Sequence, residues 1–302
     1  MRALLLYLSE SKRLAPFIMR NALSRRVARR FVAGETLDEA IAAARAVNRA
    51  GQSASLDLLG ENVTDEAGAR RTADGYLAMF DRIEREKLDA NVSLKLTQLG
   101  LDLGERLCEE LVERIVEHAT SLGNFVRIDM EGSAHTQRTI EITKRVRAKY
   151  TGVGTVVQSY LHRTEQDVND LLSVGCRIRL CKGAYKEPPE IAFQQKTDVD
   201  ANYVKLMKLL LVSGIYHGIA THDPAMVRAT KDFVREKNIA RDQFEFQMLY
   251  GINTDLQRKV AREGYRLRVY IPFGTDWFPY FMRRLAERPA NLTFFLRTLL
   301  PK

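Results

Sequence analysis

Single polar residues recur within or at the ends of short apolar segments along the sequence. Examples are Lys95 in Val-Ser-Leu-Lys-Leu, Asp129 in Val-Arg-Ile-Asp-Met and His222 in Ile-Ala-Thr-His-Asp. Each has an ordinary structural reading: an ion pair for Lys95, a helix start for Asp129 or a satisfied core histidine for His222. Because seven of eight apolar segments carry such residues at the same end, we expect them to form one polar pocket.

The residue types in this pocket narrow its chemistry. The sequence puts no nucleophile beside a base, and its five histidines are scattered without the spacing of a metal site. Lys182-Gly183-Ala184 offers a cation and backbone amides, which suit a phosphate or pyrophosphate. Gln158 and Arg179 could bind the polar edge of a flat ring. A bound redox cofactor would account for such a pocket.

A second cluster lies near the end of the chain, at Tyr280-Phe-Met-Arg283-Arg284. Residues three and four apart share one face of a helix, so both arginines lie on the side of Tyr280. Paired guanidinium groups suit a carboxylate. The alternative is a pair of surface arginines, which the neighbouring Trp277 and Phe281 disfavour.

The elements that position these residues follow a repeated order of short β-rich runs and longer amphipathic runs. The predicted strands are Ser53–Leu59, Asn91–Leu96, Phe125–Asp129, Thr155–Gln158, Arg177–Leu180, Tyr216–Ala220, Phe244–Met248 and Arg266–Ile271. The predicted helices between them are Glu66–Lys87, Glu105–Ser121, Thr136–Lys149, Glu165–Ser173, Ala201–Val212, Pro224–Glu236 and Thr254–Arg262. This alternation predicts parallel strands with helical crossovers.

Eight such units favour an α/β fold of the (β/α)₈ TIM-like barrel type, whose catalytic side chains gather at the carboxyl ends of the strands. An open doubly wound sheet is the alternative, and it lacks a Gly-x-Gly-x-x-Gly turn after the first strand. We expect residues 1–302 to form a single domain, with residues 1–50 as an N-terminal helical extension. After Pro272-Phe-Gly-Thr275, one helical stretch runs to about Leu300, and we expect it to lie over the barrel mouth.

Composition limits partners and location. Lysine and arginine exceed aspartate and glutamate to give a net charge of +9, but no nucleic-acid-binding pattern accompanies this excess. The apolar run Ala3–Leu8 is too short to span a membrane and is a poor signal peptide. The three cysteines show no pairing pattern, which is typical of reduced thiols. We therefore expect a cytoplasmic protein that binds no nucleic acid, with peripheral contact at the inner membrane left open.

Taken together, the motifs resemble those of the proline dehydrogenase family, in its monofunctional bacterial form. The matching runs are Ser93-Leu-Lys-Leu-Thr, Arg127-Ile-Asp-Met-Glu, Gln158-Ser-Tyr, Arg179-Leu-Cys-Lys-Gly-Ala-Tyr, Ala220-Thr-His, Phe244-Glu-Phe-Gln-Met-Leu-Tyr-Gly and Tyr280-x-x-Arg-Arg-Leu. Together with Leu59-Gly-Glu61 at the end of the first predicted strand, they extend to the final helix, and the ordered set is far more specific than any one piece.

The resemblance implies a flavoenzyme of proline catabolism. Such an enzyme oxidises L-proline to 1-pyrroline-5-carboxylate by hydride transfer from C5 to a flavin, and it passes the electrons to a membrane quinone. The flavin is expected to be FAD, with FMN the less favoured alternative. The oligomeric state and the role of residues 1–50 are left open.

The resemblance also implies roles for individual residues. Asp129 and Arg179 would be catalytic, with Arg179 near the reactive nitrogen of the flavin. The substrate would contact Lys95, Tyr185, Leu249, Tyr270, Tyr280, Arg283 and Arg284. The flavin would contact Met130, Gln158, Arg179, Lys182, Gly183, Ala184, Thr221 and His222. Glu61 would pair with Arg283 and gate the site. Lys186 stands where bifunctional relatives have tryptophan, which puts the flavin-edge contact there in doubt.

Two other functions compete with this interpretation. A Schiff-base aldolase built on the same barrel would use Lys95 as its nucleophile and would carry no flavin. A basic binding protein without catalysis would instead show salt-sensitive binding to nucleic acid or anionic lipid.

Overall fold

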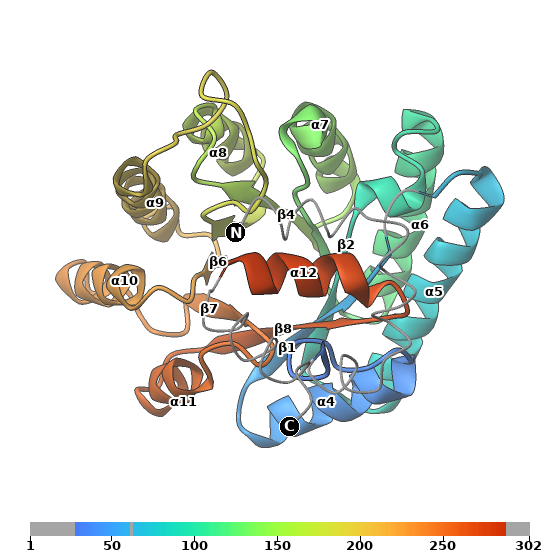
Figure 1. The fold of residues 1–302 in the computed structure, drawn as a ribbon, viewed down its shortest axis with the longest axis horizontal. Helices are drawn as coiled ribbons and strands as arrows, with labels where there is room; N and C mark the ends of the chain where they lie inside the picture. Colours follow the sequence, from blue (N-terminus) through green and yellow to red (C-terminus); the bar gives the residue numbers. More distant parts are fainter. Residues whose placement is uncertain (1–27, 61–62, 288–302) are drawn as a thin grey trace, which may run out of the picture.

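Eight parallel strands form a closed barrel in the computed structural model, which describes residues 28–60 and 63–287 (Figure 1). The strands are β1 Ser53–Leu58, β2 Ala90–Leu94, β3 Val126–Ile128, β4 Val153–Gln158, β5 Arg177–Cys181, β6 His217–Ala220, β7 Phe244–Leu249 and β8 Leu267–Phe273. Closure comes from β1 pairing with β8, where Ser53 lies opposite Arg268. The predicted barrel is confirmed, and the open doubly wound alternative is wrong.

The helices lie outside the strands, except for the last one. Their bounds are α4 Leu37–Arg49, α5 Glu66–Arg85, α6 Glu105–Ser121, α7 Ser133–Lys149, α8 Thr164–Ser173, α9 Lys196–Leu211, α10 Pro224–Glu236, α11 Thr254–Arg262 and α12 Trp277–Glu287. Within the described ranges, no helix is both long enough and apolar enough to cross a membrane.

All eight strands and all seven crossover helices occur where the sequence predicts them, with small differences at their ends. Strand β2 stops at Leu94 because Leu96–Leu99 forms a short 3₁₀ helix, η1, which ends at Gly100 with a φ of +81°. Helix α9 begins at Lys196, five residues before the predicted start. Its first turn carries Asp198 and an ion pair between Lys196 and Asp200, and these stabilise a helix start that apolar periodicity does not reveal.

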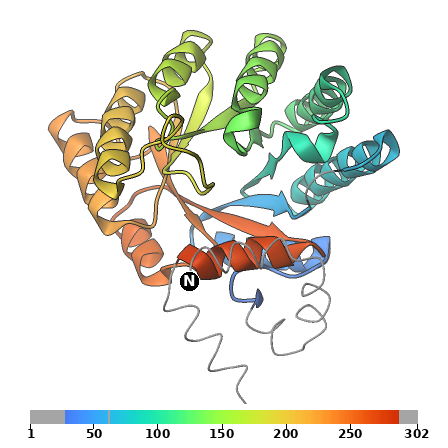
Figure 2. The same cartoon turned by 45° about the horizontal axis from the view of Figure 1, so that its top comes forward.

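Helix α4 precedes the barrel strands and covers one seam of the barrel. Its start is fixed by a capping box in which Thr36 and Glu39 satisfy each other's backbone N–H groups. Its buried face, which includes Ile41 and Ala44, packs in one core with β1 and β8. That is the position a helix after β8 would otherwise fill. The chain after β8 can therefore cross the barrel mouth as α12 (Figures 1 and 2).

A small separate core holds α12 over the mouth. The Trp277 and Phe281 rings have their centroids 5.9 Å apart, and Phe31 lies 6.3 Å from Phe281. Gly251, in the loop after β7, has a φ of +69°, and a Cβ there would lie 1.7 Å from the Arg30 carbonyl oxygen. Only glycine permits this close approach between the loop after β7 and the backbone at Arg30.

The barrel interior is unusually polar. Parallel barrels commonly fill their interior with branched apolar side chains. Here the buried strand residues include Ser55, Ser93, Arg127, Arg179, Glu245 and Gln247. Because a buried polar group without a partner is costly, these side chains must satisfy one another. Their hydrogen bonds run across the barrel and lead to the site at its mouth.

Candidate active site

A cavity of about 590 Å³ opens at the carboxyl end of the barrel, beneath α12. It brings together every predicted site residue whose side chain the structure describes. These are Lys95, Asp129, Met130, Gln158, Arg179, Lys182, Gly183, Ala184, Tyr185, Thr221, His222, Leu249, Tyr270, Tyr280 and Arg284. Glu61 lies outside the described residues. The backbone of Arg283 lies in α12, and its side chain is also outside what the structure describes.

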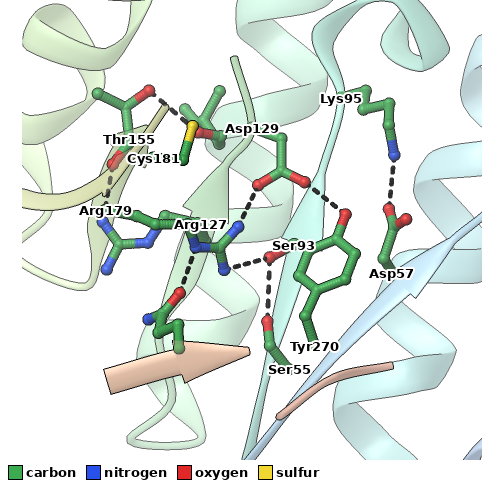
Figure 3. A network of polar contacts seen from close by, with 12 residues as sticks. Ser55, Asp57, Ser93, Lys95, Arg127, Asp129, Thr155, Arg179, Cys181 and Tyr270 are labelled. Atoms are coloured by element: carbon green, nitrogen blue, oxygen red, sulfur yellow. Dashed lines mark hydrogen bonds and ion pairs between the residues drawn. The ribbon is translucent and has the colours of Figure 1, made fainter. Parts of the chain in front are cut away.

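Asp129 is the centre of the polar contacts in this cavity (Figure 3). Its Oδ1 accepts a hydrogen bond from the Arg179 Nη1 at 2.6 Å, and its Oδ2 accepts one from the Tyr270 hydroxyl at 2.6 Å. Burial and the charge of Asp129 raise the pKa of Tyr270 well above its ordinary value. The tyrosine therefore stays protonated and donates to the carboxylate.

Arg179 is buried and held from three sides. Beside its bond to Asp129, its Nη2 donates to the Ser93 hydroxyl at 3.0 Å and its Nε donates to the Gln247 side-chain oxygen. Its guanidinium carbon also lies 5.1 Å from the centre of the Tyr270 ring. These contacts come from β2, β3, β7 and β8, so the closed barrel itself fixes the orientation of this cation.

Lys95 forms a buried ion pair with Asp57 in which Nζ and Oδ1 are 2.7 Å apart (Figure 3). Burial lowers the pKa of Lys95, but Asp57 and Asp129 outweigh it and raise the pKa above its ordinary value. The side chain is therefore an ammonium ion. Asp57 was missed by the sequence analysis, although it lies at the end of the first predicted strand, where polar residues mark the other strands.

We expect Asp57→Asn to lower the catalytic efficiency, kcat/KM, by about ten- to hundredfold, since a hydrogen bond to a charged group contributes roughly 1.5–3 kcal/mol. Without the carboxylate, the pKa of Lys95 falls, so the alkaline limb of a kcat/KM–pH profile should move to lower pH. Asp167→Asn, which alters the ion pair between the buried Asp167 of α8 and the exposed Arg163 at its N-cap, is the control. An unchanged pH profile in Asp57→Asn would limit Asp57 to a structural role.

The opposite side of the cavity presents backbone amides and cations. Gly183 has a φ of +112°, and an added Cβ would lie 2.2 Å from the Tyr160 ring, so only glycine fits. Nearby, the His222 Nε2 accepts a hydrogen bond from the Leu249 N–H at 2.9 Å. This bond makes Nε2 the unprotonated ring nitrogen of His222 and ties the end of β6 to β7.

Lys182 lies at the rim between two acidic side chains. Its Nζ is 2.5 Å from the Asp200 Oδ1 and 2.7 Å from the Asp223 Oδ2. Burial tends to raise the pKa of Asp223, but Lys182 and the Ala225 N–H lower it to about 2. An ammonium has three N–H donors, so Lys182 can donate to a ligand in addition to these two aspartates. These two aspartates were not predicted from the sequence.

Helix α12 brings Tyr280 and Arg284 to the cavity from above, and the Arg284 guanidinium lies 5.0 Å from the centre of the Tyr280 ring. The cavity is thereby lined by four cations, Lys95, Arg179, Lys182 and Arg284, against three carboxylates, Asp57, Asp129 and Asp223. Asp200 also pairs with Lys182, so the charges in and around the cavity are balanced. In the described part of the chain, no group of three or more His, Cys, Asp or Glu could hold a metal ion.

Comparison with known proteins points to one family. Residues 40–297 match the family described as proline dehydrogenase. The chain is 42% identical over 302 residues to proline dehydrogenase 1 of Bacillus subtilis subsp. natto, with 100% of both chains covered. It is 40% identical over 279 residues to proline dehydrogenase of Deinococcus radiodurans, with 91% of this chain and 90% of the relative covered.

A solved structure agrees with the fold. Proline utilization A (PutA) of Bdellovibrio bacteriovorus, in a form inactivated by N-propargylglycine, matches 87% of this chain with a TM-score of 0.83 and 26% identity. The matched region spans 33% of that longer protein.

Proposed function

Because this chain belongs to the proline dehydrogenase family, we propose that its cavity oxidises L-proline to 1-pyrroline-5-carboxylate by hydride transfer from C5 to a bound FAD. Family membership itself makes the protein an oxidoreductase of proline catabolism. The observation that carries the finer proposal is the convergence of the Asp129–Arg179 pair, Lys95 and Arg284 on one cavity.

The cavity residues fit a flavin. Gly183 lines the cavity, and its backbone lies so close to Tyr160 that only glycine fits there. Lys182 places a cation at the rim of the cavity, where Asp200 and Asp223 fix its ammonium group, and the proposal assigns it to the pyrophosphate. Met130, Gln158, Ala184, Thr221 and His222 complete the set assigned to this group. When bound, the flavin supplies the hydride acceptor.

Substrate binding is assigned to the side under α12. Arg283 and Arg284 hold the proline carboxylate, and Lys95 adds a third positive charge. Tyr185 and Leu249 pack against the pyrrolidine ring, while Tyr270 and Tyr280 limit its movement. This clamp would aim the C5–H bond at the flavin, next to which Arg179 is assigned, and such positioning supplies much of the rate.

The charges of the cavity favour the reactive form of proline. The ring nitrogen must lose its proton before its electron pair can form the C–N double bond. Lys95, Arg283 and Arg284 are expected to disfavour an additional positive charge nearby and so to lower the pKa of the bound amine. Asp129 stays paired to Arg179 and Tyr270 and holds both donors in place.

The Schiff-base alternative is weakened by the state of Lys95. A lysine that attacks a carbonyl must be unprotonated, and it usually has a depressed pKa. Asp57 and Asp129 act in the opposite direction here. Family membership also counts against a binding protein without catalysis.

The electrons are proposed to pass to a membrane quinone, from a cytoplasmic enzyme that contacts the inner membrane peripherally. The resemblance to the monofunctional bacterial enzymes and the net charge of +9 support this proposal.

The central test is the absorption spectrum. The purified protein should be yellow, and anaerobic proline should bleach its flavin band. Acid extraction and chromatography should identify the released flavin as FAD. A colourless protein that stays inert after incubation with FAD would refute the flavin proposal, and borohydride trapping of a carbonyl substrate on Lys95 would favour the aldolase.

A further inference from the structure

We infer that Gln247 is a positioning residue that fixes the rotation of the Arg179 guanidinium. Glu245 holds the Gln247 amide, and Arg268 in turn holds Glu245. This inference rests on the proposed function, since it gives Arg179 its place beside the reacting atoms. A chain of hydrogen bonds connects the closed interior of the barrel to the cavity, and each link has a defined direction.

The upper link is the bond from the Arg179 Nε to the Gln247 oxygen. The two terminal nitrogens of Arg179 already donate to Asp129 and Ser93, both on the β2–β3 side of the barrel. Gln247, on β7, accepts a hydrogen bond from Nε, the remaining nitrogen of the guanidinium. Because a planar guanidinium held at all three nitrogens cannot rotate about its long axis, Gln247 completes the restraint.

The lower link decides which way the Gln247 amide points. Its Nε2 donates to the Glu245 Oε1 at 2.5 Å, so its oxygen must face Arg179. Burial opposes ionisation of Glu245, but Arg268, whose Nε lies 2.7 Å from the same oxygen, keeps the pKa of Glu245 below its usual value. The Tyr216 hydroxyl donates to the other Glu245 oxygen at 3.0 Å.

The anchor of this chain is the barrel wall. The Arg268 Nη1 donates to the Ala54 carbonyl at 2.7 Å, which joins β8 to β1. Arg268 and Arg179 are cations and Glu245 is an anion. The Gln247 amide, which lies between Glu245 and Arg179, therefore has only one favourable orientation. A reversed amide would set its N–H₂ against a guanidinium and its oxygen against a carboxylate.

Gly218 on β6 provides the space that Gln247 needs. In the strand register it lies opposite Arg179 on one side and Glu245 on the other. A Cβ at this position would lie 2.5 Å from the Gln247 Nε2 and 2.8 Å from its Cδ. Gly218→Ala would thus displace the Gln247 side chain without replacing any of the four hydrogen-bonded residues, Arg268, Glu245, Gln247 and Arg179.

Two variants test this role from different directions. Gln247→Leu removes both links, and Gly218→Ala displaces Gln247 without removing it. Thr230→Val, which removes a buried hydrogen bond to the Met226 carbonyl in α10, is the matched control. The measurements are kcat and KM for proline and the midpoint potential of the bound flavin, which needs no turnover.

Both test variants should lower kcat by about ten- to hundredfold and change KM by less than about threefold, because the restraint acts on transition-state charge. The midpoint potential should become more negative, since a cation that can rotate away stabilises the electron-rich reduced flavin less. The control should keep the wild-type potential and kcat.

Unchanged kcat and potential in either folded variant would overturn the inference, as would a loss of thermal stability alone. If Gln247→Leu fails to fold, Gly218→Ala decides. If proline reduces the flavin of the wild-type protein, but both variants keep the wild-type kcat and midpoint potential, only the role of Gln247 is refuted. Wild-type protein without flavin reduction would refute the proposed function as well.

Discussion

Arg179→Met should lower kcat/KM for proline by about 100- to 1,000-fold, the loss typical of removing one preorganised donor that stabilises transition-state charge. The substitution deletes the bonds to Asp129, Ser93 and Gln247 together. It also leaves the Asp129 carboxylate buried without its neutralising charge. Steady-state kinetics with flavin occupancy measured in parallel is the test.

A double variant separates chemistry from stability. Arg179→Met together with Asp129→Asn removes both charges, so the free energy of unfolding should recover much of what the single variant loses. Activity should stay low, since neither charge is restored. Arg179→Lys keeps a point charge without the fork and should recover activity only in part. Arg179→Met with kcat/KM near the wild-type value would remove Arg179 from the catalytic assignment.

Much of the fold could be predicted because its periodicities are local. Alternating strand and helix patterns are sufficient to find eight parallel strands, and parallel strands with right-handed crossovers leave few ways to close a sheet. The position of α12 over the mouth was also predicted, from aromatic and basic residues that a purely packing helix would not need. The early start of α9 was missed because charged residues stabilise its first turn.

The candidate site was predictable as far as strand ends mark it. Asp129, Arg179 and Tyr270 lie on separate strands, yet the shared carboxyl edge of the barrel brings them together. The assigned roles of these residues remain predictions. The same holds for Glu61 and the Arg283 side chain, which lie outside what the structure describes.

The pairing of these side chains with residues of other elements could not be predicted. Asp57 pairs with Lys95 on the neighbouring strand, and Asp200 reaches Lys182 from α9. Strand order and register decide which side chains meet, and a one-dimensional pattern does not contain either. The requirement for glycine at Gly218 is another such case, because it depends on where the Gln247 side chain lies.

Arg284→Met should raise KM for proline by about ten- to hundredfold, since a charged contact to a carboxylate contributes roughly 1.5–3 kcal/mol. Arg284, on α12, lines the same cavity as Lys95 and Asp129. Arg283→Met should have a similar effect if both arginines share the carboxylate. Lysine at either position should rescue only part of the loss, because it lacks the planar fork. Flavin content should stay near that of the wild type.

Pyrrolidine, which is proline without the carboxylate, makes this test specific. If Arg284 binds the carboxylate, Arg284→Met should lose proline oxidation but oxidise pyrrolidine about as well as the wild type, because the missing contact is absent in both cases. Arg228→Met, on the exposed face of α10, controls for the loss of one positive charge. Equal losses on proline and pyrrolidine would mean that Arg284 supports the cavity without binding the carboxylate. Wild-type kinetics on both compounds would make it a surface arginine and would remove the charge-based reason for an amino-acid substrate.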